Sequence, residues 1–294
     1  MPTNVLHTPL PVAKARTFGG TAGPLPAVRV GSGAPPLLLV HGVGATHRDW
    51  FTAGFADSLS ERHALVAVDR PGYGASPPRG AERWSVARQA EALAATISTE
   101  GLKAPVVVAH SFGALPVLAM VLQGTPVSAL VLIAGVYYPK GIWARTAGAL
   151  LAGKGRFRRA VRGAALPLAR SSLGLMIAQM FAPDPPTDAF NTHFETDLAS
   201  RKSQLEASLE DAAMICRESA ALAPRYGALR LPILLIAGSG DRVVPTHSQT
   251  VAFSRAVPQA QCHVLKGEGH MVHHTARQKV VGLTEAFLGK EVPS

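Results

Sequence analysis

The serine at position 111 stands where a nucleophile could be presented. A short valine-rich run, residues 105–109, is followed by His110-Ser111-Phe112-Gly113 and then by an apolar segment that favours a helix. A sharp turn between a strand and a helix projects a serine hydroxyl above the sheet. Such a turn brings two backbone segments together and requires small flanking residues, here Ala109 and Gly113. The same pattern could also arise by chance in a chain this rich in glycine and alanine.

A serine becomes a nucleophile when a base takes its proton and a third group orients that base. Asp241 follows the apolar run 232–236, and His270 follows the run 262–265 and a glycine turn. A single loop aspartate is usually a turn former, and any one of the 11 histidines could be structural. Together, Ser111, Asp241 and His270 each come just after a predicted strand, in an order that predicts nucleophile, orienting acid and base.

Three other histidines could compete with His270 for the role of base. His263 falls inside the last predicted strand, whereas His273 and His274 fall inside the helix predicted after it. We interpret all three as surface or helix-packing residues.

Two backbone amides could complete this set. The predicted helix start places the N–H of Phe112 beside Ser111. The loop 41–44 follows the first buried run and can supply a second N–H, from Val43. Amides in these places would stabilise a developing oxyanion. His41, in the same loop, is a candidate for the substrate pocket.

The elements that must position these residues alternate along the chain. Continuous apolar runs at 37–40, 64–68, 105–109, 129–133, 232–236 and 262–265 are typical of strands covered on both faces. Helices are expected between them, at 82–99, 112–123, 247–256 and 272–288. This alternation predicts an α/β fold with a mostly parallel, doubly wound sheet. Ligands of such sheets bind beyond the carboxyl ends of the strands, where the three candidate residues stand.

One long segment departs from this rhythm. Residues 136–230 contain no convincing buried strand and are rich in Arg, Ala, Leu and Met. We expect a helical insertion there, a lid over a core formed by residues 1–135 and 231–294.

The chain resembles the α/β-hydrolase superfamily over nearly its whole length. The resemblance implies a Ser111–His270–Asp241 triad, an oxyanion hole from the amides of Val43 and Phe112, and a helical lid at roughly 136–230. One departure is Ala109, where the family usually has glycine. The matching segments are His41-Gly42-Val43-Gly44, Asp69-Arg70-Pro71-Gly72-Tyr73-Gly74-Ala75-Ser76, Ala109-His110-Ser111-Phe112-Gly113, Gly238-Ser239-Gly240-Asp241-Arg242-Val243-Val244-Pro245 and Gly267-Glu268-Gly269-His270.

The resemblance narrows the chemistry but leaves alternatives. Related dehalogenases and epoxide hydrolases carry an aspartate nucleophile where this chain has Ser111. Some relatives place the acid after the fourth predicted strand, but residues 133–137 contain no carboxylate. The leading interpretation is a carboxylic ester hydrolase that works through an acyl-enzyme. A carbon–carbon bond hydrolase of the ring-cleavage type, a perhydrolase-like enzyme and a non-catalytic binding protein on the same fold stay open.

Apolar and aromatic residues of the insertion could line a substrate pocket. They favour a small-molecule substrate with a hydrophobic acyl or aromatic part. The alternative is that they only pack the helices of the insertion. These candidates are Tyr137, Trp143, Met176, Met180 and Phe181.

Much of the net charge of +10 is local, because residues 140–170 hold eight Lys or Arg and no Asp or Glu. On a helix, Arg158, Arg159 and Arg162 would face away from Phe157 and Val161. A basic amphipathic helix can lie on an anionic membrane, although a solvated basic face explains the same pattern. Aromatic residues are not interleaved with basic ones as in a nucleic-acid platform, so we expect no nucleic-acid partner.

The remaining composition points to a globular, reducing-compartment protein. Hydrophobic residues make up 47% of the 294 residues and charged residues 16%, so a large core can form. Cys216 and Cys262 form no C-x-x-C pair, which favours the cytoplasm. The first 20 residues hold no apolar run of a signal peptide, and no run is long enough to span a bilayer.

We see no zinc-type cluster and no complete G-x-G-x-x-G, and expect neither metal nor cofactor. The sequence carries no signal for an oligomeric state.

Overall fold

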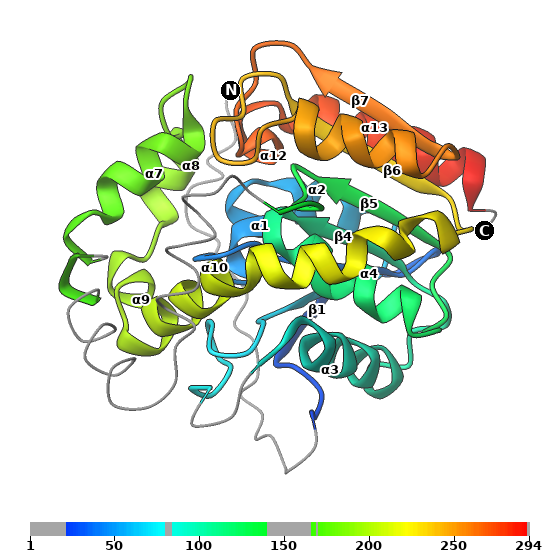
Figure 1. Cartoon of the computed structure of the whole chain (residues 1–294), viewed down its shortest axis with the longest axis horizontal. Coiled ribbons are helices and arrows are strands. Elements are labelled where there is room, and N and C mark those ends of the chain that lie inside the picture. Colours follow the sequence, from blue (N-terminus) through cyan, green and yellow to red (C-terminus); the bar gives the residue numbers. More distant parts are fainter. Residues whose placement is uncertain (1–21, 80–83, 140–165, 169, 293–294) are drawn as a thin grey trace.

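Seven strands form one sheet in the computed structural model, which describes residues 22–79, 84–139, 166–168 and 170–292. The sheet has the order β1-β3-β2-β4-β5-β6-β7 (Figure 1). β1 runs antiparallel to β3, and the other neighbours are parallel. The strands are β1 (Ala27–Val30), β2 (Leu37–Val40), β3 (Leu65–Val68), β4 (Val106–His110), β5 (Ala129–Ile133), β6 (Ile233–Gly238) and β7 (Ala260–Leu265).

The six predicted apolar runs coincide with β2 to β7, which confirms the α/β fold with a mostly parallel sheet. Two strands differ from the prediction. β1 was missed, because the exposed Arg29 interrupts its apolar run and only Val28 is buried. β7 was expected to be buried on both faces, but it is an edge strand, and 42% of Val264 is exposed.

The strand register places the loops that carry the candidate site residues at one edge of the sheet. Val40 pairs with Ala109, and Ile133 pairs with both His110 and Ile236. The loops that follow β2, β4 and β6 therefore leave the sheet at the same edge.

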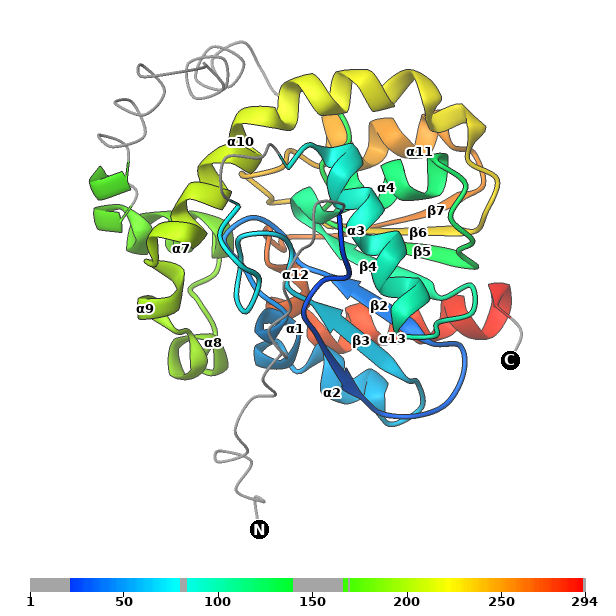
Figure 2. The ribbon, with the colours of Figure 1, turned by 90° about the horizontal axis from the view of Figure 1, so that it is seen from below.

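Alternate strand residues belong to two hydrophobic clusters, one on each face of the sheet. Leu38 and Val40 pack with the first cluster, and Leu37 and Leu39 with the second. Figure 2 shows the corresponding helices above and below the sheet. The first face carries α3 (Val86–Thr99), α4 (Ala114–Leu122) and α11 (Ala252–Ala256), and the second carries α1 (Arg48–Thr52), α2 (Phe55–Ser60) and α13 (Arg277–Glu291).

The predicted helices are present with shifted boundaries. The helix predicted at 82–99 begins at Val86, because the Ser85 side chain accepts a hydrogen bond from the Arg88 amide and caps it. The one predicted at 112–123 starts as the 3₁₀ turn η1 (Ser111–Gly113) before α4. The segment 247–256 is a π-helical turn, η3 (His247–Val251), followed by α11. The segment 272–288 is divided into α12 (Val272–Thr275) and α13.

The described part of 136–230 is helical, with no strand among its described residues. It comprises α7 (Leu173–Phe181), α8 (Asp188–His193), α9 (Thr196–Ala199), α10 (Lys202–Leu222) and the turn η2 (Ala223–Ala228). In Figures 1 and 2, α7, α8 and α9 lie to one side of the sheet, and α10 runs from them back across the core. Ile215 and Leu222 of α10 join the first hydrophobic cluster. Trp143 and most of the basic run lie outside the described residues.

No helix within the described ranges has both the length and the hydropathy to cross a membrane.

Candidate active site

Ser111 lies on a sharp turn between β4 and α4. Its φ of 54° is in the left-handed region, which a non-glycine residue adopts at an energetic cost. The turn packs closely against the end of β2 (Leu37–Val40), because a Cβ at Gly113 would lie 2.7 Å from the carbonyl oxygen of His41 and 2.8 Å from that of Val40. Ala109 is fully buried in β4, so the alanine is accommodated on the strand side. This geometry is the strand–turn–helix elbow that the sequence predicts.

His270 and Asp241 form a hydrogen-bonded chain with this serine. The Nε2 atom of His270 lies 3.0 Å from Ser111 Oγ, and Nδ1 lies 2.7 Å from Asp241 Oδ2. The other carboxylate oxygen, Asp241 Oδ1, accepts the amide N–H groups of Val243 at 2.8 Å and Val244 at 2.7 Å. All three side chains are buried. The structure thus brings the three predicted residues together, with His270 between Ser111 and Asp241.

The loops that carry Asp241 and His270 are joined by backbone contacts. The Ser239 amide donates to the Leu265 carbonyl at 2.9 Å, and the Gly240 amide donates to the Glu268 carbonyl at 2.8 Å. A Cβ at Gly238 would lie 2.1 Å from the same Glu268 oxygen. Glycine at this position therefore allows the close approach that sets the Asp241–His270 distance.

A cavity of about 590 Å³ opens beside Ser111 and His270, and Val43 and Phe112 also line it. Phe112 lies in the first helical turn after the elbow, where backbone amides have no partner within the helix. Both residues whose amides are the predicted donors thus line the same cavity as Ser111.

The cavity wall is mainly apolar, and most of its residues come from the described part of 136–230. Three predicted pocket residues, Met176, Met180 and Phe181, line it. The prediction missed Phe190 and Ile215 of the same wall. Within α7, positions 173, 176, 177 and 180 all line the cavity, a helical spacing that could have been read from the sequence.

Two predicted pocket residues are elsewhere, and this corrects the sequence interpretation. His41 and Tyr137 are fully buried and are not part of the cavity wall. The ring of Tyr137 stacks on Phe253 at 4.3 Å between centroids, inside the first hydrophobic cluster. The His41 Nε2 atom accepts the Arg70 amide N–H at 2.9 Å. Burial and the Arg70 charge lower the pKa of His41 to about 3, so this ring is neutral and structural.

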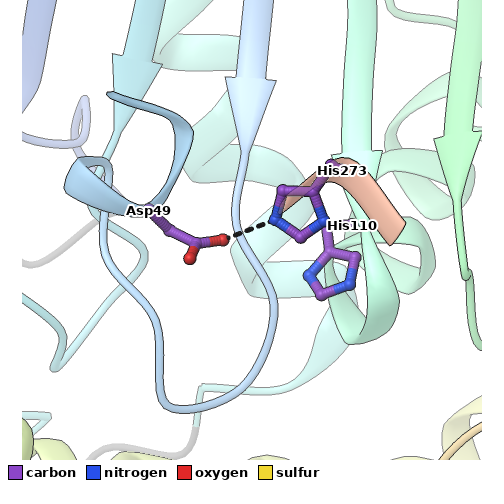
Figure 3. A group of neighbouring side chains, drawn as sticks. All are labelled: Asp49, His110 and His273. Atoms are coloured by element: carbon purple, nitrogen blue, oxygen red, sulfur yellow. Dashed lines mark hydrogen bonds and ion pairs between the residues drawn. The ribbon is translucent and has the colours of Figure 1, made fainter. Parts of the chain in front are cut away.

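A buried cluster that includes Asp49, His110 and His273 (Figure 3) lies next to His270, since the rings of His110 and His270 are 4.9 Å apart. Asp49 accepts hydrogen bonds from Nε2 of His273 and Nε2 of His274, both at 2.9 Å. His110 Nε2 lies 3.3 Å from the carbonyl oxygen of His270, and its ring is 4.3 Å from that of His273. The prediction that His273 and His274 pack a helix omitted their common acceptor, Asp49. The cluster ties α1, the elbow and α12 together.

The same cluster is the group of described residues that could be considered for a metal ion. Asp49, His110 and His273 each offer one ligand atom, and these atoms lie within 4.8 Å of one another. Both oxygens of Asp49 already accept imidazole N–H groups, however. Hydrogen bonding therefore accounts for the carboxylate without a metal.

The geometry can be set beside known proteins. A family model described as the alpha/beta hydrolase family matches residues 37–283. The magnesium-chelatase 30 kDa subunit of Rhodobacter capsulatus is 28% identical over 265 residues, which cover 85% of each chain. An uncharacterized protein of Mycobacterium tuberculosis is 24% identical over 284 residues, 91% of this chain and 79% of the relative.

Solved structures share the fold at low sequence identity. A thermophilic esterase from Thermogutta terrifontis has a TM-score of 0.67 at 19% identity, covering 92% of this chain and 94% of its own. A bromoperoxidase from Bacillus anthracis has a TM-score of 0.72 at 18% identity, covering 90% and 95%. A meta-cleavage product hydrolase from Pseudomonas fluorescens has a TM-score of 0.66 at 18% identity, covering 90% and 94%. These likenesses concern the fold and do not separate one activity from another.

Proposed function

Since the chain belongs to the alpha/beta hydrolase family, we propose that it is a serine hydrolase that cleaves a hydrophobic carboxylic ester through an acyl-enzyme. The observation that carries this proposal is the hydrogen-bonded chain Ser111–His270–Asp241 at the wall of an apolar cavity. Family membership alone leaves the reaction open, whereas this chain of groups is what acyl transfer needs.

The mechanism follows from the positions of these groups. His270 Nε2 takes the proton of Ser111 Oγ as the oxygen attacks the acyl carbon, and Asp241 stabilises the resulting imidazolium. The N–H groups of Val43 and Phe112 hold the oxyanion. The tetrahedral intermediate collapses, and His270 gives its proton to the leaving alcohol. Water then attacks the acyl-enzyme with His270 again as base, and Ser111 recovers its proton when the acid leaves.

The cavity supports an apolar acyl or aromatic substrate. Its volume of about 590 Å³ is in the range of small-molecule sites, and Met176, Met180, Phe181 and Phe190 contribute to its wall. These side chains come from the insertion, which in this proposal serves as a lid over Ser111.

The first experiment treats the purified protein with a fluorescent fluorophosphonate, which labels an activated serine. We expect the wild type to label and Ser111→Ala not to label. Ser172→Ala is the matched control, because Ser172 lines the same cavity but lies outside the hydrogen-bonded chain. A p-nitrophenyl ester series from short to long acyl chains then measures how much acyl chain the cavity accepts.

Each other result supports a different function. Labelling at Ser111 without ester turnover would favour carbon–carbon bond cleavage or perhydrolysis, which product analysis distinguishes. No labelling of well-folded protein would favour a non-catalytic binding protein.

A further inference from the structure

Arg70 is a fully buried cation next to the loop that carries Val43. Its guanidinium donates from Nε to the His41 carbonyl at 2.9 Å and from Nη2 to the Gly42 carbonyl at 2.8 Å. Its side chain is 1% exposed, so water does not compete for these bonds. The planar guanidinium group of Arg70 therefore holds two consecutive carbonyl groups of this loop.

The second of these bonds determines where the Val43 amide points. The Gly42 carbonyl and the Val43 N–H belong to one planar trans peptide and point in opposite directions. His41 Nδ1 also lies 2.8 Å from the Gly42 oxygen, and it carries the hydrogen because Nε2 accepts the Arg70 amide. Two donors thus hold the carbonyl end, and the N–H end is directed away from Arg70.

The same guanidinium contacts the residue that supplies the second amide. Its central carbon lies 4.9 Å from the centroid of the Phe112 ring and 4.7 Å from that of Tyr73. A cation above an aromatic ring is attracted to it, more strongly when water is excluded. Arg70 therefore contacts the Phe112 ring and also the carbonyl group of the peptide whose N–H belongs to Val43.

The charge of Arg70 is balanced from α10, within the helical insertion. Arg70 Nη1 donates to Asp211 Oδ2 at 2.7 Å, and Arg79 Nη2 donates to Asp211 Oδ1 at 2.8 Å. Burial alone would raise the pKa of the Asp211 carboxyl, but Arg79 and Arg70 lower it below its ordinary value of 3.8. The carboxylate is therefore ionised, and breaking this buried pair would be strongly unfavourable.

We propose that Arg70 is a positioning residue that orients the Val43 amide toward the oxyanion, and that Asp211 links this orientation to α10. The inference rests on the proposed hydrolase function and adds to it a residue that does not touch the substrate. It also gives the insertion a part in assembling the site.

The test compares Arg70→Met with Arg79→Met. Both variants remove one cation from Asp211, but Arg79 donates to the Pro71 carbonyl and not to residues 41–43. For a p-nitrophenyl ester that the wild type hydrolyses, we expect Arg70→Met to lower kcat roughly ten- to hundred-fold with KM changed less than about threefold. A trifluoromethyl ketone, which forms the oxyanion, should lose affinity in the same proportion. Arg79→Met should keep both values within about threefold of wild type.

Thermal unfolding of each variant separates positioning from loss of fold. If Arg70→Met does not fold, Arg70→Lys decides, because lysine keeps the charge beside Asp211 but cannot hold both carbonyls in one fork. An equal loss of kcat in Arg70→Met and Arg79→Met, or full kcat in folded Arg70→Lys, would overturn the inference alone. A wild type that neither labels with fluorophosphonate nor hydrolyses any ester would overturn the proposed function, and the inference with it.

Discussion

At the scale of the residue, the site depends on polar side chains whose hydrogen bonds fix their orientation. Asp241 uses one oxygen for two backbone amides and the other for His270. Ser111 is held in a backbone conformation that alanine or serine seldom adopts. Small chemical changes at these positions should therefore have large and separable effects.

Asp241→Asn should reduce kcat by roughly 10³- to 10⁴-fold. Since Val243 and Val244 donate N–H groups to Oδ1, the asparagine oxygen is required on that side, and its NH₂ group would face His270. His270 would then carry its proton on Nε2 and could not accept one from Ser111. Ester kinetics measure the loss, and the melting temperature should change little. A kcat within tenfold of wild type would contradict the assigned acid.

Gly113→Ala should lower the free energy of unfolding by roughly 2 kcal/mol or more, because the added methyl would meet two backbone oxygens that cannot move aside. Gly174→Ala is the control, since nothing lies within 4 Å of a Cβ there and alanine favours the helix. Urea unfolding of both variants gives the comparison. Equal stability of the two would mean that the elbow is looser than its geometry indicates.

At the scale of the element, short helices at the carboxyl edge of the sheet hold the loops of the candidate site. α1 follows β2, and α12 follows the loop of His270. Asp49 of α1 joins them through its hydrogen bonds with His273 and His274 of α12. These bonds span 224 and 225 residues of sequence. They therefore connect an early segment of the chain with a late one, and His273 also lies against His110, the neighbour of Ser111.

Asp49→Asn should lower the free energy of unfolding by about 1–3 kcal/mol, because an amide has one acceptor oxygen and leaves one buried imidazole N–H unpaired. Burial would raise the pKa of Asp49, but His274 and His273 lower it well below its ordinary value of 3.8, so a full charge is lost in the variant. Asp184→Asn, at an exposed loop position, serves as control. Equal urea midpoints for both variants would contradict this role.

At the scale of the whole molecule, buried neutral histidines make the fold sensitive to acid. Burial, with the Arg70 charge second, lowers the pKa of His41 from 6.5 to about 3. Burial also lowers the pKa of His273 to about 4 and that of His110 well below 6.5. The unfolded chain binds these protons near pH 6.5, whereas the folded protein does not, so folding should weaken as the pH falls.

Stability should be constant with respect to these groups above about pH 7 and should fall from about pH 6.5 toward pH 4. Each proton taken up on unfolding contributes about 1.4 kcal/mol per pH unit, so three histidines together reach about 4 kcal/mol per pH unit. Urea midpoints measured between pH 7.5 and pH 5 give this slope. A stability that does not change over that interval would show that these rings are not held neutral.

The surface near the cavity suggests a contact with lipid, a proposal that starts from the basic run of residues 140–170. Leu168 and Leu175 are 69% and 65% exposed, and Leu168 and Met176 line the cavity. Exposed apolar side chains that are close in sequence to a basic segment favour binding to an anionic membrane surface. We expect co-sedimentation with anionic vesicles, weakened by Leu175→Asp but not by Val264→Asp on the distant edge strand. Equal binding to anionic and neutral vesicles would contradict the proposal.

The sequence by itself determined the layers of the fold and the three catalytic candidates, because both are local signals. A buried parallel strand is a short continuous apolar run, and Ser111, Asp241 and His270 each lie a few residues after one. Because parallel strands end at the same edge of a sheet, the positions of the strands alone predict that these residues lie near each other.

Only the tertiary structure decided which polar groups share a partner. Asp211 lies 141 residues from Arg70, and no local pattern marks the pair. By residue type, His41 and Tyr137 are suited to a pocket, but both are fully buried: Tyr137 stacks on Phe253 of α11, and His41 lies against Arg70 and Tyr73. Val264 appeared buried by the same rule that identified the central strands, yet its strand is at the edge of the sheet. The spacing of apolar residues predicts local helix or strand structure. Burial and hydrogen-bond pairing depend on which distant segments the folded chain brings together.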